Sequence, residues 1–83
     1  MTDHELKIWP EFYWALQAGI KRYEVRSTDR AFMLGQSILF REWSPTAKEY
    51  TGQHLIGRIT YITPAGTMGL PINLCVFGVE LVE

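Results

Sequence analysis

Residues 19–26 read Gly-Ile-Lys-Arg-Tyr-Glu-Val-Arg, and this stretch decides the fold because it joins a helix to a strand. The residues before it have helical spacing, and Gly19 is expected to end that helix in a left-handed conformation. From Arg22 to Ser27 charged and apolar residues alternate, which predicts a strand with Tyr23 and Val25 on one face. The stretch therefore places a lysine, a carboxylate and an arginine at a helix-to-strand junction.

Upstream of the junction, the sequence predicts a first strand and the helix itself. His4 to Ile8 alternates polar and apolar residues, which is typical of a short strand. The helix is expected to start at Trp9-Pro10, since a proline at the first helical position loses no hydrogen bond. Helical spacing predicts an inward face made of four apolar residues: Phe12, Ala15, Leu16 and Ile20.

Downstream, three more strands are predicted, over Ser37–Trp43, His54–Thr63 and Ile72–Val82, with Lys48–Gln53 as the polar tip of a hairpin. The last strand is nearly all apolar in its centre, which predicts a place inside the sheet. One helix among about five short strands, without repeated βαβ crossovers, indicates a mixed α+β, mainly β fold. We expect a small β-barrel capped by one N-terminal helix.

Length and composition set limits on the class of protein. A chain of 83 residues suffices for one modest core, so residues 1–83 are predicted to form a single domain. The formal charge of −1 means that any basic site must be local. No apolar stretch approaches the roughly 18–20 residues of a membrane helix. A lone cysteine cannot form an internal disulfide, so we expect a cytoplasmic protein. We also expect a monomer with no membrane partner.

The charged residues of the junction are the best candidates for a functional site. Glu24 and Arg26 lie two apart on a strand and share a face, which Lys21 can reach with its flexible stem. In a pocket, Arg26 can hold a phosphate or a base edge, while Glu24 orients it or accepts a proton from a base amine. Lys21 supplies a fixed positive charge. The alternative is that Glu24 and Arg26 merely pair on a solvated strand face.

Other side chains fall into three groups. Arg22 and Arg30 extend the basic run and are expected to form a rim around the site. The stacking candidates for bases are Trp14, on the outward face of the helix, and Tyr50, at the hairpin tip. Core packing is expected for Trp9, Trp43 and the thiol of Cys75. The two histidines, His4 and His54, lack metal-ligand spacing, so no metal is predicted.

The series Gly19-x-Lys21-x-x-Glu24-x-Arg26 resembles the signature of the ASCH domain, a member of the PUA-like β-barrel superfamily. The likeness extends to the His4-Glu5-Leu6-Lys7 strand before the Trp-Pro helix, to Phe32 and Gly35, and to the Leu39–Trp43 strand and Tyr50-Thr51-Gly52. It covers residues 4–63 and matches a compact bacterial and phage branch.

This resemblance implies a β-barrel whose cleft, beside the first helix, receives RNA or a modified nucleoside and is lined by Lys21, Glu24 and Arg26. Some relatives are small amidohydrolases acting on acylated cytidine, and others are linked to RNA cleavage. In the amidohydrolases a threonine stands where this chain has Glu24. We therefore expect an RNA- or nucleotide-binding domain without a cofactor. The alternatives are a hydrolase with Lys21 and Glu24 as its acid–base pair, and a protein-interaction domain.

Overall fold

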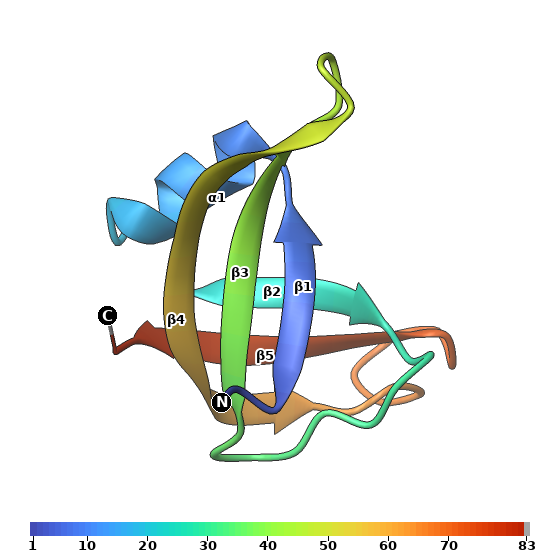
Figure 1. The fold of residues 1–83 in the computed structure, drawn as a ribbon. Coiled ribbons are helices and arrows are strands. Elements are labelled where there is room, and N and C mark those ends of the chain that lie inside the picture. The colour runs from blue at the N-terminus through green and yellow to red at the C-terminus, as the bar shows by residue number, and fades with distance from the viewer. Residues whose placement is uncertain (83) are drawn as a thin grey trace.

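The computed structural model describes residues 1–82. These residues form five strands and one helix (Figure 1). The strands are β1 (His4–Ile8), β2 (Tyr23–Ser27), β3 (Ser37–Ser44), β4 (Glu49–Thr63) and β5 (Leu74–Leu81), and the helix is α1 (Pro10–Gln17). The predicted mainly β fold with one helix near the N-terminus is confirmed.

The strands of the described residues form one sheet in the order β1-β3-β4-β5-β2. β1 pairs with β3 in parallel, and every other neighbouring pair is antiparallel. Figure 1 shows the sheet rolled up, so that β2 and β5 run across β1 and β3. β1 and β2 are its two edges, and within residues 1–82 no backbone ladder joins them. The fold is therefore a half-barrel, open along a seam between β1 and β2.

β4 belongs to both layers of the rolled sheet. Residues 49–58 pair with β3, and residues 57–63 pair with β5 after a bend that Figure 1 shows clearly. A register shift with β5 marks a bulge, which helps a strand to bend. At Gly57 a Cβ atom would lie 2.8 Å from Cγ1 of Val79, so a glycine lets the two strands approach this closely.

The core fills the space enclosed by the two layers. It is formed by side chains at alternate positions of the strands and by two residues of α1: Leu6, Ile8, Tyr13, Leu16, Ile38, Phe40, Leu55, Ile59, Cys75, Phe77 and Val79. Cys75 is buried, as predicted, and this burial raises the pKa of its thiol. A protonated, enclosed thiol is a poor nucleophile, which agrees with the expected core role.

α1 begins and ends as the sequence predicts. Pro10 occupies its first position. Gly19 has a φ of 76°, and the N–H groups of Ile20 and Lys21 both donate to the carbonyl of Ala15 at 3.0 Å. This left-handed turn satisfies the last carbonyls of the helix and directs the chain into β2.

The predicted inward face of α1 was wrong in two positions. Tyr13 and Leu16 are the buried residues, whereas Phe12 and Ile20 are exposed. Ile20 lies beyond the end of α1 at Gln17, so the helical period no longer applies to it. Phe12 instead faces the seam.

The remaining strands differ from the prediction mainly at the hairpin. β4 begins at Glu49, within the segment predicted as a polar tip, because the chain turns earlier. Lys48 closes this turn by donating its N–H to the carbonyl of Ser44 at 2.7 Å. β5 lies between β4 and β2, inside the sheet as predicted. Within residues 1–82, no helix is long and apolar enough to cross a membrane.

Candidate ligand-binding cleft

The seam between β1 and β2 is a cleft of about 600 Å³. This volume lies in the range of roughly 300–1,000 Å³ that is typical of small-molecule sites. The cleft is bounded by β1, by β2, by the start of α1 and by the turn after β2. Its lining is Leu6, Lys7, Ile8, Trp9, Phe12, Lys21, Tyr23, Glu24, Val25, Arg26, Ser27, Asp29, Arg30 and Phe32.

The charged face of β2 is its inner face. Glu24 is only 4% exposed and pairs with Phe77 of β5, a core residue. Tyr23 and Val25, the apolar residues of the strand, are exposed on the other face. Burying a charge costs free energy unless it is paired, so a strand that only stabilised the fold would bury its apolar face. β2 is inverted: its charged face is inside and its apolar face is outside. The interpretation of Glu24 and Arg26 as a solvated strand face was therefore wrong.

Lys21, Glu24 and Arg26 converge, as the sequence predicts. The Lys21 ammonium lies 2.8 Å from Oε2 of Glu24, and Nη2 of Arg26 lies 3.6 Å from Oε1. The ammonium also lies 5.3 Å from the ring centroid of Phe12 and 5.4 Å from that of Tyr23. Contacts of this kind attract a cation to an aromatic face, so Lys21 is held in place on several sides.

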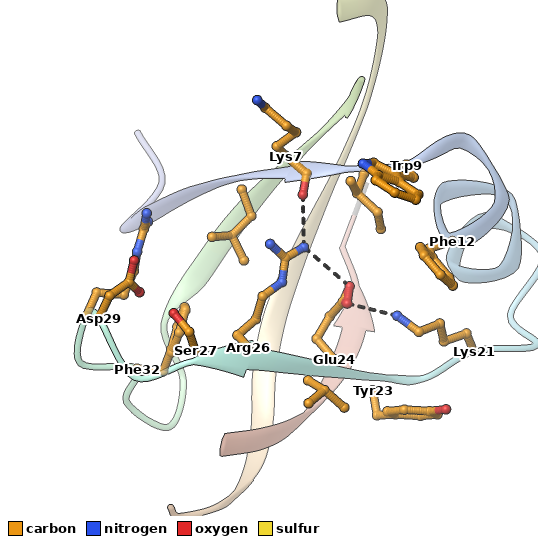
Figure 2. Close-up of a pocket in the computed structure, with 14 residues that line it drawn as sticks. Lys7, Trp9, Phe12, Lys21, Tyr23, Glu24, Arg26, Ser27, Asp29 and Phe32 are labelled. Atoms are coloured by element: carbon orange, nitrogen blue, oxygen red, sulfur yellow. Dashed lines mark hydrogen bonds and ion pairs between the residues drawn. The ribbon is translucent and has the colours of Figure 1, made fainter. Parts of the chain in front are cut away.

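Arginine side chains bridge the seam where a backbone ladder is missing. Nη2 of Arg26 donates a hydrogen bond to the carbonyl of Lys7 on β1 at 3.1 Å. Figure 2 shows the Arg26 guanidinium between the two edge strands, with the Lys7 side chain pointing away from the cleft. Further along, Nη1 of Arg30 lies 3.4 Å from the carbonyl of Glu5. These contacts join β1 to β2 and to the turn that follows it.

One oxygen of Glu24 stands out chemically. Oε1 is buried, and among the described residues it has no hydrogen-bond partner. Nη2 of Arg26, its ion-pair partner, is too distant at 3.6 Å for a good hydrogen bond. Buried carboxylate oxygens normally accept hydrogen bonds, so Glu24 keeps an unused acceptor among the lining residues of the cleft.

Two exposed aromatic side chains stand at the end of the cleft near α1. Trp9 is 47% exposed and Phe12 is 44% exposed. The prediction that Trp9 packs in the core was wrong, because Pro10 starts α1 and leaves Trp9 outside it as the N-cap residue. Figure 2 shows Phe12 beside Lys21 and Trp9 next to the end of β1. The sequence did not predict either residue as part of the site. For Trp9 the available signal was Pro10, because a helix that starts at this proline leaves Trp9 outside it.

The other predicted site residues divide between the cleft and the outside. Arg30 lines the cleft, as expected of a rim residue, but Arg22 does not and instead donates from Nε to the Gly19 carbonyl at 3.0 Å. Trp14 projects outward from α1, as predicted, yet it does not line the cleft. Tyr50 also lies elsewhere, with the guanidinium of Arg41 3.8 Å from its ring centroid.

The charges of the cleft are mixed. The lining contains two carboxylates, Glu24 and Asp29, and four cationic residues: Lys7, Lys21, Arg26 and Arg30. The Lys7 side chain points away from the cleft, so the positive excess within it is small (Figure 2). Such a site suits a ligand with both donors and acceptors better than a bare polyanion. Residues 1–82 contain no group of three or more histidine, cysteine, aspartate or glutamate side chains placed to hold a metal ion.

Comparison with known proteins gives one finding. A family model described as "Domain of unknown function (DUF3850)" matches residues 3–79. No curated protein matches the chain. The matched span includes α1, β1 to β4 and all the charged residues of the cleft.

Proposed function

The chain belongs to the DUF3850 family, and we propose that it binds RNA or a nucleotide-like ligand in the cleft between β1 and β2. The observation that carries this proposal is the cluster of Lys21, Glu24 and Arg26 in the lining of the cleft, in which Oε1 of Glu24 has no hydrogen-bond partner among the described residues. Nucleobases present amine or ring N–H donors beside acceptor atoms. Glu24 accepts from such a donor, and Arg26 donates to the acceptor next to it.

The walls of the cleft support the same class of ligand. Trp9 and Phe12 are exposed at one end, where a base can stack on their rings. Arg30, at the other end, is available for a phosphate. The resemblance of Gly19-x-Lys21-x-x-Glu24-x-Arg26 to the ASCH signature adds independent support.

Fluorescence anisotropy with labelled single-stranded RNA tests the proposal. We expect Lys21→Ala and Arg26→Ala each to weaken binding at least about tenfold, since each removes a charged contact from an enclosed site. Affinity should also fall as salt is raised, because phosphate contacts release counterions. Arg22→Ala is the matched control: it removes a cation from the same segment but from outside the cleft. Equal affinities in all four proteins would refute the proposal.

Loss of a cation beside a buried carboxylate also lowers the stability of the protein. A second variant is therefore needed to show that weaker binding does not come from unfolding. Arg26→Lys keeps the positive charge but loses the paired N–H groups of the guanidinium. We expect this variant to fold and still to bind weakly. Circular dichroism of each variant at the assay temperature separates loss of binding from loss of fold.

A hydrolase acting on a modified nucleoside or on RNA is the second candidate function. The 2.8 Å contact between Lys21 and Glu24 favours it, because a carboxylate next to an ammonium can serve as an acid–base pair. Glu24 would activate a water for attack on an acyl or phosphoryl group. Glu24→Gln should then abolish turnover of an acylated cytidine while the protein stays folded. Absence of turnover by the wild type across a panel of nucleosides and RNAs would exclude this candidate.

We infer a cytoplasmic location and a monomeric state for the binding-competent protein. The one cysteine of the sequence, Cys75, supports this location, because it is unpaired and buried. A monomer leaves the cleft open to a polymeric ligand. Sedimentation of the free protein and of its RNA complex tests the stoichiometry.

A further inference from the structure

An aromatic surface lies on the outer face of the sheet, on the other side of β2 from Glu24. Gly78 of β5 pairs with Tyr23 of β2 on one side and with Tyr61 of β4 on the other. Residues directly opposite each other on neighbouring strands project from the same face. Tyr23 is 51% exposed and Tyr61 is 72% exposed. These three residues are termed the Tyr-Gly-Tyr row.

The spacing in the row suits a planar ring. Neighbouring strands lie about 4.8 Å apart, so the two tyrosines arise from backbones about 10 Å apart. Stacked aromatic rings have centroids about 4.5–7 Å apart, so a flat ring above Gly78 can contact both tyrosines. A Cβ atom at Gly78 would lie 2.5 Å from Oγ1 of Thr60, so the Thr60 hydroxyl covers Gly78 and forms the floor on which such a ring rests.

The row lies between a charged row and an uncharged row on the same face. On one side Arg58 of β4 pairs with Glu80 of β5, and on the other side lie Val25, Val76 and Thr63. β2 is inverted, so its apolar side chains are on this outer face rather than in the core. Exposed aromatic rings near a cation such as Arg58 are typical of surfaces that stack the bases of single-stranded RNA.

The row is continuous with the cleft through Tyr23. Tyr23 lines the cleft, and its ring centroid lies 5.4 Å from the Lys21 ammonium. Figure 2 shows its ring on the side of β2 away from Glu24 and Arg26. Because β2 is an edge strand, a chain of nucleotides leaving the cleft can pass over it onto the row without crossing another strand.

We propose that the Tyr-Gly-Tyr row stacks a base of single-stranded RNA next to the nucleotide held in the cleft. This inference rests on the proposed function, and it specifies the ligand: an RNA strand of at least two nucleotides rather than a free mononucleotide. The cleft holds one base by hydrogen bonds, and the row adds affinity for a neighbouring base without reading its sequence.

The test compares Tyr61→Ala with the wild type on homo-oligonucleotides of one, three and six nucleotides in each of the four bases. Tyr61 lies outside the cleft and is well exposed, so the variant is expected to fold. The affinity for the trinucleotide should fall between about fivefold and 150-fold, the loss of one stacked base. The affinity for the mononucleotide should not change. Tyr61→Phe should bind as the wild type, as should Trp14→Ala, which removes an exposed ring elsewhere.

The outcomes separate this inference from the proposed function. If Lys21→Ala loses the trinucleotide but Tyr61→Ala keeps it, the cleft binds RNA and the row does not. If the wild type binds no oligonucleotide, both proposals fail. If the wild type self-associates through a surface that Tyr61→Ala disrupts, with RNA affinity unchanged, the row is a protein interface and the inference is overturned.

Discussion

The two edge strands of the sheet face each other across the seam and carry opposite kinds of side chain. β1 turns Leu6 and Ile8 inward, where both are buried in the core. β2 turns Glu24 and Arg26 inward and exposes its apolar residues. A strand that only stabilised the fold would resemble β1, since buried charges must be paired before they cease to cost free energy. We infer from this difference that the inward side chains of β1 mainly stabilise the fold, whereas those of β2 mainly form the candidate site.

The largest effect is expected on the β1 side. Leu6→Ala should lower the free energy of unfolding by about 2–5 kcal/mol, because it removes a buried side chain and leaves a cavity. Val25→Ala, on the exposed face of β2, is the matched control and should change it by less than about 1 kcal/mol. Urea denaturation measures both. Similar losses in the two variants would break the contrast between the edges.

The next effect concerns the charged residues of β2 and of the segment just before it. The triple variant Lys21→Met, Glu24→Leu, Arg26→Met should be as stable as the wild type, or more stable by up to about 4 kcal/mol, because apolar side chains replace a buried charge cluster. It should bind no RNA. The double variant that keeps Glu24 should be less stable by about 3 kcal/mol, since it leaves a buried carboxylate without a counter-ion. A triple variant less stable than the double variant would contradict this assignment.

A smaller effect is expected where β4 bends, since this bend brings the two edges opposite each other. Gly57→Ala should lower the free energy of unfolding by about 1–3 kcal/mol, because the added methyl group must displace Val79. RNA affinity should fall as well, since both walls of the cleft depend on the bend. Gln53→Ala, an exposed change on the same strand, is the control. An unchanged urea midpoint for Gly57→Ala would show that the strands have room to separate.

The smallest effect is at the start of β1 and depends on pH. Oδ2 of Asp3 accepts hydrogen bonds from the N–H of Ser37 at 2.9 Å and from its hydroxyl at 3.1 Å. These bonds hold the pKa of the Asp3 carboxyl below its ordinary value of 3.8. A carboxyl with a lower pKa in the folded state stabilises it above the unfolded pKa, and this contribution is lost as pH falls through the folded pKa.

Asp3→Asn should therefore lower the Tm slightly at neutral pH, and the difference from the wild type should shrink below about pH 4. Thermal unfolding followed by circular dichroism over a pH series measures it. Asp29→Asn is the control for a general charge effect, because Asp29 lies in the turn after β2. A Tm difference that stays constant down to the acid limit would assign the effect to something other than ionisation.

The sequence predicted the elements better than their orientation. Alternation located β1 and β2, and proline and glycine located both ends of α1, because these signals act on the local backbone. Alternation gives a strand two faces but does not say which one is inside. For β2 the usual rule would put Tyr23 inward, and the structure puts Glu24 there instead. That choice depends on the partner strand β5 and on the seam, which are contacts distant in sequence.

The site was predicted in part for the same reason. Lys21, Glu24 and Arg26 lie close in the chain, so their convergence follows from one turn and one strand. Trp9 and the carbonyl of Lys7 join the site only because β1 comes to face β2 after the sheet has rolled up. Trp14 and Tyr50 are exposed aromatic residues, as predicted, but exposure alone does not place them at the cleft.

The contact between Arg26 and the carbonyl of Lys7 has a consequence for how this fold can diversify. In a closed barrel, the distance between neighbouring strands is fixed by the backbone ladder and is the same for every sequence. Here two arginine side chains, Arg26 and Arg30, span the opening instead of a ladder. A shorter or longer residue at position 26 would change the size of ligand admitted while every strand keeps its register. Related proteins with this fold can therefore differ in ligand selectivity without a change in the sheet.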